Sequence, residues 1–381
     1  MRSKLIICTI CAVLFPLFTT GQDLRLPESW MQEFKQVRPL YQEDTLSLCF
    51  VGDVMMHAEQ LVRCGLDGSA VSGYRGKVRS ESLTAYFSHI EGFVKEADIA
   101  VANIETTFAG APYSGYPAFN SPDEYADAVV DAGFDVFCCA NNHLFDKGSA
   151  GAKRTMNLYE EQGIRFTGIG RTDCELTKNT PLMLLCKGIR IALINFTYGT
   201  NARANEVKIN LMDDREAISE AIRRARDNGA DVVIALPHWG DEYKLTHNAV
   251  QRDMAGWLEA QGCDAVIGCH PHVVQDFEYI EEMPVVYSTG NFVSNMSAKN
   301  TQMGLVAKLK IERRQNGDTR LLEPEFILTW CSRPRGFNDD YVILPAKGML
   351  DRETEWKHKA DYDKMKSTYD RIINLHPGYD R

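Results

Sequence analysis

The chain has 381 residues, a formal net charge of −10 and 44% hydrophobic residues. This length suits one domain with an extension, and the apolar content is enough for a sizeable core. The acidic balance argues against nucleic acid or an anionic membrane as partner. The 11 cysteines are irregularly spaced, so we expect one disulfide at most and no disulfide framework.

Residues 1–21 have the pattern of a cleaved secretory signal. Arg2 and Lys4 precede an apolar run and a short stretch of small residues. The run is too short to span a membrane comfortably, which favours cleavage. A lipoprotein signal needs a small residue before its cysteine, and neither Cys8 nor Cys11 has one. We therefore predict an exported protein, periplasmic or at the cell surface, without a lipid anchor.

Strands and helices alternate after a polar lead-in at residues 22–45. Apolar runs predict strands at 46–52, 98–102, 134–140, 182–186, 189–196, 231–236, 266–268 and 285–288. Helical spacing predicts helices at 81–96, 122–131 with Ser121 as N-cap, 148–162, 213–228 and 249–261. The alternation predicts an α/β core with much parallel pairing. Residues 63–80, rich in glycine and serine, are expected to form a mobile loop.

The C-terminal part has a different pattern. Residues 304–345 lack intervening helices and predict added antiparallel strands. From about residue 353 the tail is charged, and Trp356, Met365 and Ile372 are expected to anchor a surface helix. We therefore divide the chain after the signal and lead-in into a domain at 46–293 and an extension at 294–381.

Polar side chains follow five of the predicted strands directly. They are Asp53, His57, Asn103, Glu105, Asn141, Asn142, His143, His238, His270 and His272. Five of the chain's nine histidines belong to this set. Because ligands of such folds bind beyond the carboxyl ends of the strands, we expect these side chains to converge.

Carboxylates, imidazoles and a carboxamide together suit divalent Mn, Fe or Zn. The set exceeds what one tetrahedral zinc needs and favours two metal ions bridged by a shared carboxylate. Singly, each residue has an ordinary reading: Asp53 could cap a helix, Asn142 could occupy a left-handed turn, and His143 could be structural. Their joint placement after different strands favours the metal site.

The segment His270-Pro271-His272 presents two imidazoles from a stiff turn. Proline fixes its own φ and should push His270 towards an extended backbone. The competing reading is a loop with two surface histidines.

Six motifs resemble the CapA (PgsA) family of capsule-synthesis proteins associated with poly-γ-glutamate. They lie at 50–57, 102–105, 140–143 with Asp146 and Gly148, 237–243, 270–272 and 287–292. The resemblance covers roughly residues 46–293. The family is related to calcineurin-like metallophosphoesterases, which implies a four-layer fold with two packed mixed β-sheets flanked by helices.

The resemblance also implies roles for the strand-end residues. The first metal would be held by Asp53, His57 and His272, and the second by Asn142, His238 and His270. Glu105 would occupy the bridging position, and His143 would be the general acid. Two departures fit the capsule family better than the phosphatases: three residues separate Asp53 from His57 instead of one, and the bridging residue is Glu instead of Asp.

Substrate contacts are expected from nearby polar and aromatic residues. These are Asn103, Tyr113, Tyr116, Phe119, Tyr198, Asn201, Arg203, Glu242 and Asn291. Arg75, Lys77 and Arg203 are candidates to bind anionic groups of the substrate. Each of them, taken alone, is more simply explained as an ordinary charged surface residue.

The leading hypothesis is an exported capsule-synthesis protein with a dinuclear hydrolytic site, in which a metal-held hydroxide attacks and His143 protonates the leaving group. Its substrate would be an anionic polymer or a phosphoester or amide, and membrane-bound capsule-synthesis proteins are possible partners. One alternative is a non-catalytic polymer-binding or export scaffold. Another is an extracytoplasmic metallophosphoesterase for small esters.

Overall fold

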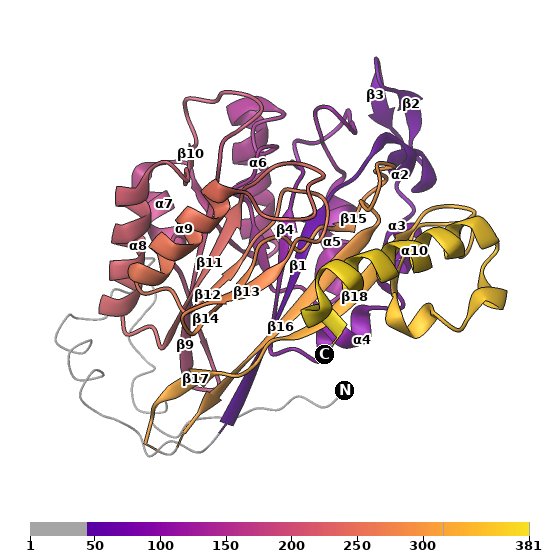
Figure 1. Cartoon of the computed structure of the whole chain (residues 1–381). Coiled ribbons are helices and arrows are strands. Elements are labelled where there is room, and N and C mark those ends of the chain that lie inside the picture. Colours follow the sequence, from indigo (N-terminus) through magenta and orange to yellow (C-terminus); the bar gives the residue numbers. More distant parts are fainter. Residues whose placement is uncertain (1–43, 315, 381) are drawn as a thin grey trace, which may run out of the picture. The chain divides into compact units, whose positions relative to one another are not determined.

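Two mixed β-sheets organise the residues that the computed structural model describes, 44–314 and 316–380 (Figure 1). The predicted signal segment and nearly all of the lead-in lie outside the described residues. Within the described ranges, no helix has the length and apolar content needed to cross a membrane.

The first sheet contains nine strands. They are β1 (Asp44–Val54), β4 (Ile99–Ile104), β5 (Val136–Cys138), β6 (Arg165–Thr167), β15 (Asn291–Val293), β16 (Met303–Arg313), β17 (Thr319–Leu321), β18 (Glu325–Ser332) and β19 (Val342–Pro345). Their order is β19-β18-β16-β1-β4-β5-β6, with β15 beside β1 and β17 beside β16. Strands β1, β4, β5 and β6 run parallel, whereas β16, β18 and β19 add antiparallel strands. The prediction of antiparallel strands at 304–345 is confirmed.

The second sheet has six strands in the order β13-β14-β12-β11-β9-β8. They are β8 (Leu182–Cys186), β9 (Ile189–Thr197), β11 (Val232–His238), β12 (Ala265–Ile267), β13 (Phe277–Ile280) and β14 (Met283–Val286). The two strands predicted at 182–186 and 189–196 form an antiparallel hairpin, β8 and β9, and β9, β11, β12 and β14 are parallel. Parallel pairing brings the carboxyl ends of these strands to one edge of the sheet.

Alternating burial along β1 shows how the layers form. Leu48 and Phe50 belong to a core between the two sheets, whereas Cys49 and Val51 belong to a core against helices. Those helices are α2 (Ala58–Arg63), α3 (Ser80–Thr84), α4 (Glu91–Lys95), α5 (Asp123–Asp131) and α6 (Gly148–Glu161). A third core lies under α8 (Arg215–Asp227) and α9 (Ala249–Ala260) on the second sheet. The predicted α/β class with two packed mixed sheets flanked by helices is confirmed.

The C-terminal helix α10 (Lys359–Leu375) lies over β18, as Figure 1 shows in yellow. Met365 and Ile372 are fully buried on it, and Trp356 is buried just before it. All three belong to the core between the sheets, together with Trp330 of β18. The predicted anchors are therefore confirmed.

Three local predictions are wrong. The helix predicted at 81–96 is divided into α3, a 3-10 turn (Ala85–Phe87) and α4, and the break before α4 begins at Ser88, a weak helix former. The N-cap of α5 is Pro122, and Ser121 instead hydrogen-bonds Thr106 through their hydroxyls at 2.8 Å.

The expected mobile loop at 63–80 contains a hairpin of β2 (Asp67–Ser69) and β3 (Gly73–Arg75). It is tied down by two backbone hydrogen bonds between Tyr74 and Tyr113, of 2.8 and 2.9 Å. Further elements were not foreseen from the sequence. They include helices α2 and α7 (Asp173–Asn179), strands β6, β13 and β15, and the paired strands β7 (Ile169–Gly170) and β10 (Lys208–Ile209).

Candidate metal centre and adjoining pocket

The strand-end residues converge where the two sheets meet. Asp53 lies in β1, Glu105 directly follows β4, and His238 is the last residue of β11. These three side chains are at most 1% exposed. The strand predicted at 231–236 thus runs on to His238, so this histidine is fixed by sheet pairing and not by a loop.

Three groups of side chains place their ligand atoms within 4.8 Å of one another. In the described part of the chain these groups are Asp53–Glu105–His272, Glu105–His238–His270 and Glu242–His270–His272. Glu105 is common to the first two groups, and His270 and His272 are divided between them. This arrangement has the pattern expected of two cation positions that share one carboxylate.

Glu105 is fully buried, and neither of its carboxylate oxygens has a hydrogen-bond partner among the described residues. Glu105 Oε1 lies 3.7 Å from His238 Nε2 and 3.9 Å from His143 Nε2. Burial and the negative charge of Asp53 raise the pKa of Glu105 well above its usual value. A buried carboxylate without partners is costly, and a cation would relieve that cost. Because His270 Nδ1 also lacks a partner among these residues, the donor set fits a divalent metal.

Hydrogen bonds orient the first group. Asn103 Nδ2 donates to Asp53 Oδ1 at 2.7 Å, and His272 Nδ1 lies 3.0 Å from both Asp53 Oδ2 and Asn291 Oδ1. Burial opposes the charged form of His272, but the hydrogen bond to Asp53 outweighs it and the pKa of His272 is raised. With Nδ1 bonded to two oxygens, Nε2 is the nitrogen left free for a metal.

Asn142 and His238, the predicted ligands of the second metal, contact each other. His238 Nε2 donates to Asn142 Oδ1 at 2.9 Å, and Asn103 Nδ2 lies 3.3 Å from His238 Nδ1. Burial and then the neighbouring histidines lower the pKa of His238 well below its usual value. The ring is therefore neutral, as a metal ligand must be.

The His-Pro-His turn has an unusual backbone. His270 has φ of +102° and His272 has φ of +58°, so the expectation of an extended His270 is wrong. Left-handed backbone at two residues other than glycine is strained and persists only when its surroundings enforce it. Backbone hydrogen bonds do so here: Tyr243 N donates to Pro271 O at 2.8 Å, and Cys269 N donates to Pro237 O at 2.9 Å.

Close approach also requires glycine at position 268, where the turn begins. A Cβ there would lie 2.2 Å from Tyr287 O and 2.5 Å from Trp239 Nε1. The Trp239 indole donates to the same carbonyl at 2.9 Å. The turn is therefore packed against both flanking strands, β11 and β14.

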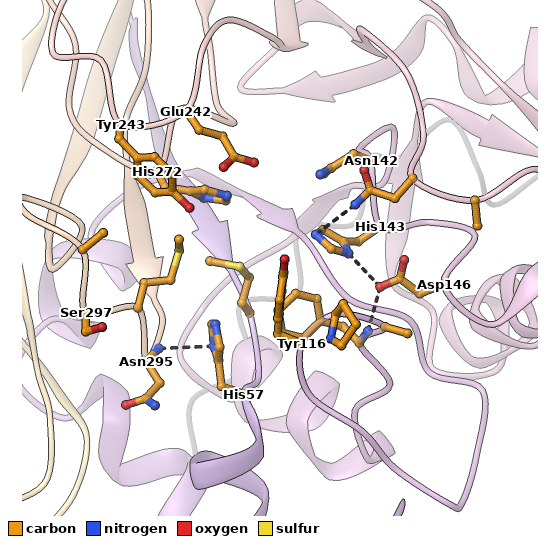
Figure 2. Close-up of a pocket in the computed structure, with 18 residues that line it drawn as sticks. His57, Tyr116, Asn142, His143, Asp146, Glu242, Tyr243, His272, Asn295 and Ser297 are labelled. Atoms are coloured by element: carbon orange, nitrogen blue, oxygen red, sulfur yellow. Dashed lines mark hydrogen bonds and ion pairs between the residues drawn. The ribbon is translucent and has the colours of Figure 1, made fainter. Parts of the chain in front are cut away.

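His143 is held by an aspartate. Its Nδ1 donates to Asp146 Oδ2 at 2.7 Å (Figure 2). Asn201 Nδ2 lies 3.4 Å from its Nε2. Phe119 packs edge-on against the ring at 4.7 Å and donates its backbone N–H to Asp146 at 2.6 Å. Sequence reasoning noted Asp146 in the motif but gave it no role; the three-residue spacing from His143 was the available signal.

His57 belongs to none of the three groups. It is the N-cap residue of α2, and its Nδ1 accepts a hydrogen bond from the backbone N–H of Asn295 at 3.2 Å, as Figure 2 shows. Burial lowers the pKa of His57 to about 4. Its role as a metal ligand stays a prediction.

A pocket of about 810 Å³ opens over these residues (Figure 2). Of the predicted substrate residues, Tyr116, Phe119, Asn201 and Glu242 line it. Asn103 and Asn291 do not line the pocket but hydrogen-bond the candidate ligands Asp53 and His272. The ring of Tyr198 packs on that of His270, with 4.5 Å between their centroids. Tyr113 and Arg203 are not among the lining residues. Lining residues that sequence reasoning missed include Tyr243, Asn295, Met296 and Ser297.

Comparison with known proteins places most of the chain in one family. The family model described as "Bacterial capsule synthesis protein PGA_cap" matches residues 47–296. The "Capsule biosynthesis protein CapA" of Bacillus anthracis is 27% identical over 383 residues, covering 95% of this chain and 87% of that protein. The "PGA biosynthesis protein CapA" of Bacillus subtilis (strain 168) is 27% identical over 290 residues, covering 73% of this chain and 70% of that protein.

Two solved structures are similar to this chain at lower sequence identity. One is a Staphylococcus aureus protein provisionally described as a 5′-nucleotidase, in complex with alpha-ketoglutarate, with a TM-score of 0.47 and 13% identity over 86% of this chain. The other is the NAD nucleotidase NadN of Haemophilus influenzae, with a TM-score of 0.42 and 15% identity over 88% of this chain. The chain spans 58% and 61% of the length of these two proteins.

Proposed function

Because the chain belongs to the bacterial capsule synthesis family PGA_cap, we propose that it is an exported, metal-dependent hydrolase acting in the production of a surface polymer such as poly-γ-glutamate. The similar Bacillus proteins, named for capsule and PGA biosynthesis, support the polymer. The observation that carries the metal-dependent part is the fully buried, unpartnered Glu105 shared by two ligand groups.

Two divalent ions, of Mn, Fe or Zn, would be held at this site. Asp53 and His272, with His57 as a further predicted ligand, would hold the first ion. Asn142, His238 and His270 would hold the second, and Glu105 would be shared. When bound, such ions act as Lewis acids towards a carbonyl or phosphoryl oxygen and lower the pKa of water.

The chain's own residues supply the proton and position the substrate. Asp146 accepts a hydrogen bond from His143 Nδ1, which fixes the ring and directs Nε2 towards Asn201 at the pocket. When both of its nitrogens carry a proton, His143 would donate the Nε2 proton to a leaving oxygen or nitrogen. Phe119 excludes water from one side of the ring. The substrate would be an ester, phosphoester or amide, and capsule-synthesis proteins in the membrane would be partners.

Metal analysis combined with His143→Ala tests the proposal. We expect purified protein at neutral pH to retain transition metal, and we expect the variant to retain it too. Turnover of poly-γ-glutamate or of an aryl phosphate with added manganese should fall roughly 10²- to 10⁴-fold in the variant. His89→Ala, which changes an exposed histidine, is the matched control and should leave turnover unchanged.

Protein without bound transition metal would sink the catalytic proposal. Bound metal with full turnover in His143→Ala would reject the acid role alone. Polymer binding that survives chelation without any turnover would favour the non-catalytic scaffold.

A further inference from the structure

A second cavity of about 710 Å³ adjoins the catalytic pocket. The segment after β18 and the start of α10 form most of it, and it is lined by Glu59, Asn295, Arg333, Pro334, Arg335, Gly336, Tyr341, His358, Ala360, Asp361 and Lys364. We call it the C-terminal groove. Asn295 lines both cavities, and its backbone N–H bonds His57 on the catalytic side (Figure 2). A ligand long enough to pass Asn295 could therefore occupy both.

Three cations of the groove have no carboxylate within 4 Å in the part of the chain that the structure describes. They are Arg333, Arg335 and Lys364, and the side chain of Arg335 makes no hydrogen bond to any described residue. Arg333 donates to Asn295 O at 3.5 Å, and Lys364 donates to the side chain of Gln302. By contrast, two nearby lysines outside the groove form ion pairs, Lys357 with Asp339 and Lys359 with Asp363.

The acidic residues of the groove are already engaged within the protein. Glu59 Oε2 accepts from Asn295 Nδ2 at 2.8 Å, and Asp361 Oδ2 accepts from Ser332 Oγ at 2.8 Å. Burial and then the charge of Arg333 lower the pKa of Lys364, against the opposite effect of Asp361. Arg333 and Lys364 thus repel each other, and the groove carries three cations against the two carboxylates of Glu59 and Asp361, in a chain of net charge −10. An anion between them would relieve this repulsion.

The catalytic pocket has the opposite character, since none of its lining residues is Lys or Arg and two are Asp146 and Glu242. An anionic substrate would therefore have its fixed cationic partners in the groove and its reacting bond in the pocket. Pockets for single small molecules measure about 300–1,000 Å³. Two adjoining cavities of about 810 and 710 Å³ suit an extended ligand better.

We propose that the C-terminal groove binds carboxylate groups of an extended polymer whose next units reach the catalytic pocket. The identity of the polymer rests on the proposed function, and the groove adds the place where its carboxylate groups are bound. Guanidinium groups bind carboxylates through paired hydrogen bonds, which suits Arg333 and Arg335.

The test is binding of fluorescently labelled poly-γ-glutamate to the full chain in EDTA, followed by anisotropy. We expect the double variant Arg335→Gln/Lys364→Gln to bind roughly tenfold more weakly than the unchanged protein, and binding to weaken as NaCl is raised. The matched control, Lys178→Gln/Lys366→Gln, removes two exposed lysines outside the groove and should bind within about twofold of the unchanged protein. Equal thermal unfolding of both variants would show that folding is intact.

Equal binding by the groove variant and the unchanged protein would overturn the inference. Tighter binding of an oligonucleotide of matched charge would also overturn it, in favour of a polyphosphate. Because binding is measured without metal, failure of the metal-dependent proposal leaves this result unaffected. Conversely, loss of polymer binding leaves metal content and aryl phosphate turnover as independent measures of the catalytic site.

Discussion

At the residue level, Glu105 combines full burial with two carboxylate oxygens that have no partner among the described residues. Asp53, the nearest negative charge in the site, adds repulsion and is itself satisfied by Asn103 and His272. A group of this kind reduces the stability of the metal-free protein, since burying an unpaired charge is unfavourable. The same group should then contribute strongly to metal binding, because only the bound protein satisfies it.

Glu105→Gln should therefore act in opposite directions with and without metal. In EDTA we expect the variant to be about 1–3 kcal/mol more stable than the unchanged protein, because it loses a buried unpaired charge. With manganese, the unchanged protein should gain stability and the variant should gain much less. Thermal unfolding measures both effects, with Glu161→Gln on the exposed face of α6 as the control. A variant less stable in EDTA would contradict this account of Glu105.

At the level of elements, β1 carries Asp53 to the site by packing tightly against β15. Gly52 makes this possible, because a Cβ there would lie 1.8 Å from Gly290 O. The same carbonyl accepts the backbone N–H of Asp53 at 3.0 Å. The position of the carboxylate thus depends on the absence of a side chain at the preceding residue.

Gly52→Ala should destabilise the protein by more than about 3 kcal/mol and reduce bound metal, since β1 must move away from β15. Gly256→Ala is the matched control within α9. A Cβ at Gly256 would meet only Arg252 Nη1, at 3.7 Å, so the helical alanine should stabilise by about 0.5–1 kcal/mol. Denaturant unfolding with metal analysis distinguishes the two. Similar small effects from both substitutions would show that the β1–β15 contact is not tight.

For the whole molecule, the sequence predicted most of the convergence of candidate ligands. Asp53, Glu105 and His238 end or follow parallel strands, and parallel strands end on the same side. A run of apolar residues is a local feature of the sequence, so these strands could be predicted from it directly. The antiparallel character of β16 was likewise predictable, but its pairing with β1 was not, because strand partners are chosen through non-local contacts.

The side chains that support the site could not be predicted from the sequence, because their contacts are also made between distant parts of the chain. Asn195 reads as a polar break within an apolar run, yet its side chain accepts from the backbone N–H groups of Cys139 and Ala140 and donates to Leu236 O. It thereby joins the end of β5 to the second sheet beside the site. Asn295 joins the two cavities only because the chain returns there after β15.

Protonation of the buried histidines should make stability of the metal-free protein depend on pH. Burial lowers the pKa of His57 to about 4 and that of His270 to about 3, below the unfolded value of about 6.5. Their contribution to stability is complete above about pH 6.5 and is lost as pH falls towards 3–4, because the unfolded chain binds protons first. Glu105, whose pKa is raised, acts oppositely, because the folded state binds its proton first as the pH falls.

We expect the free energy of unfolding in EDTA to fall by roughly 2 kcal/mol between pH 7 and pH 5, measured by urea unfolding, and to fall more steeply in Glu105→Gln. Flat stability of Glu105→Gln across this range, where the opposing carboxyl group is absent, would mean that these imidazoles are not buried in the neutral form.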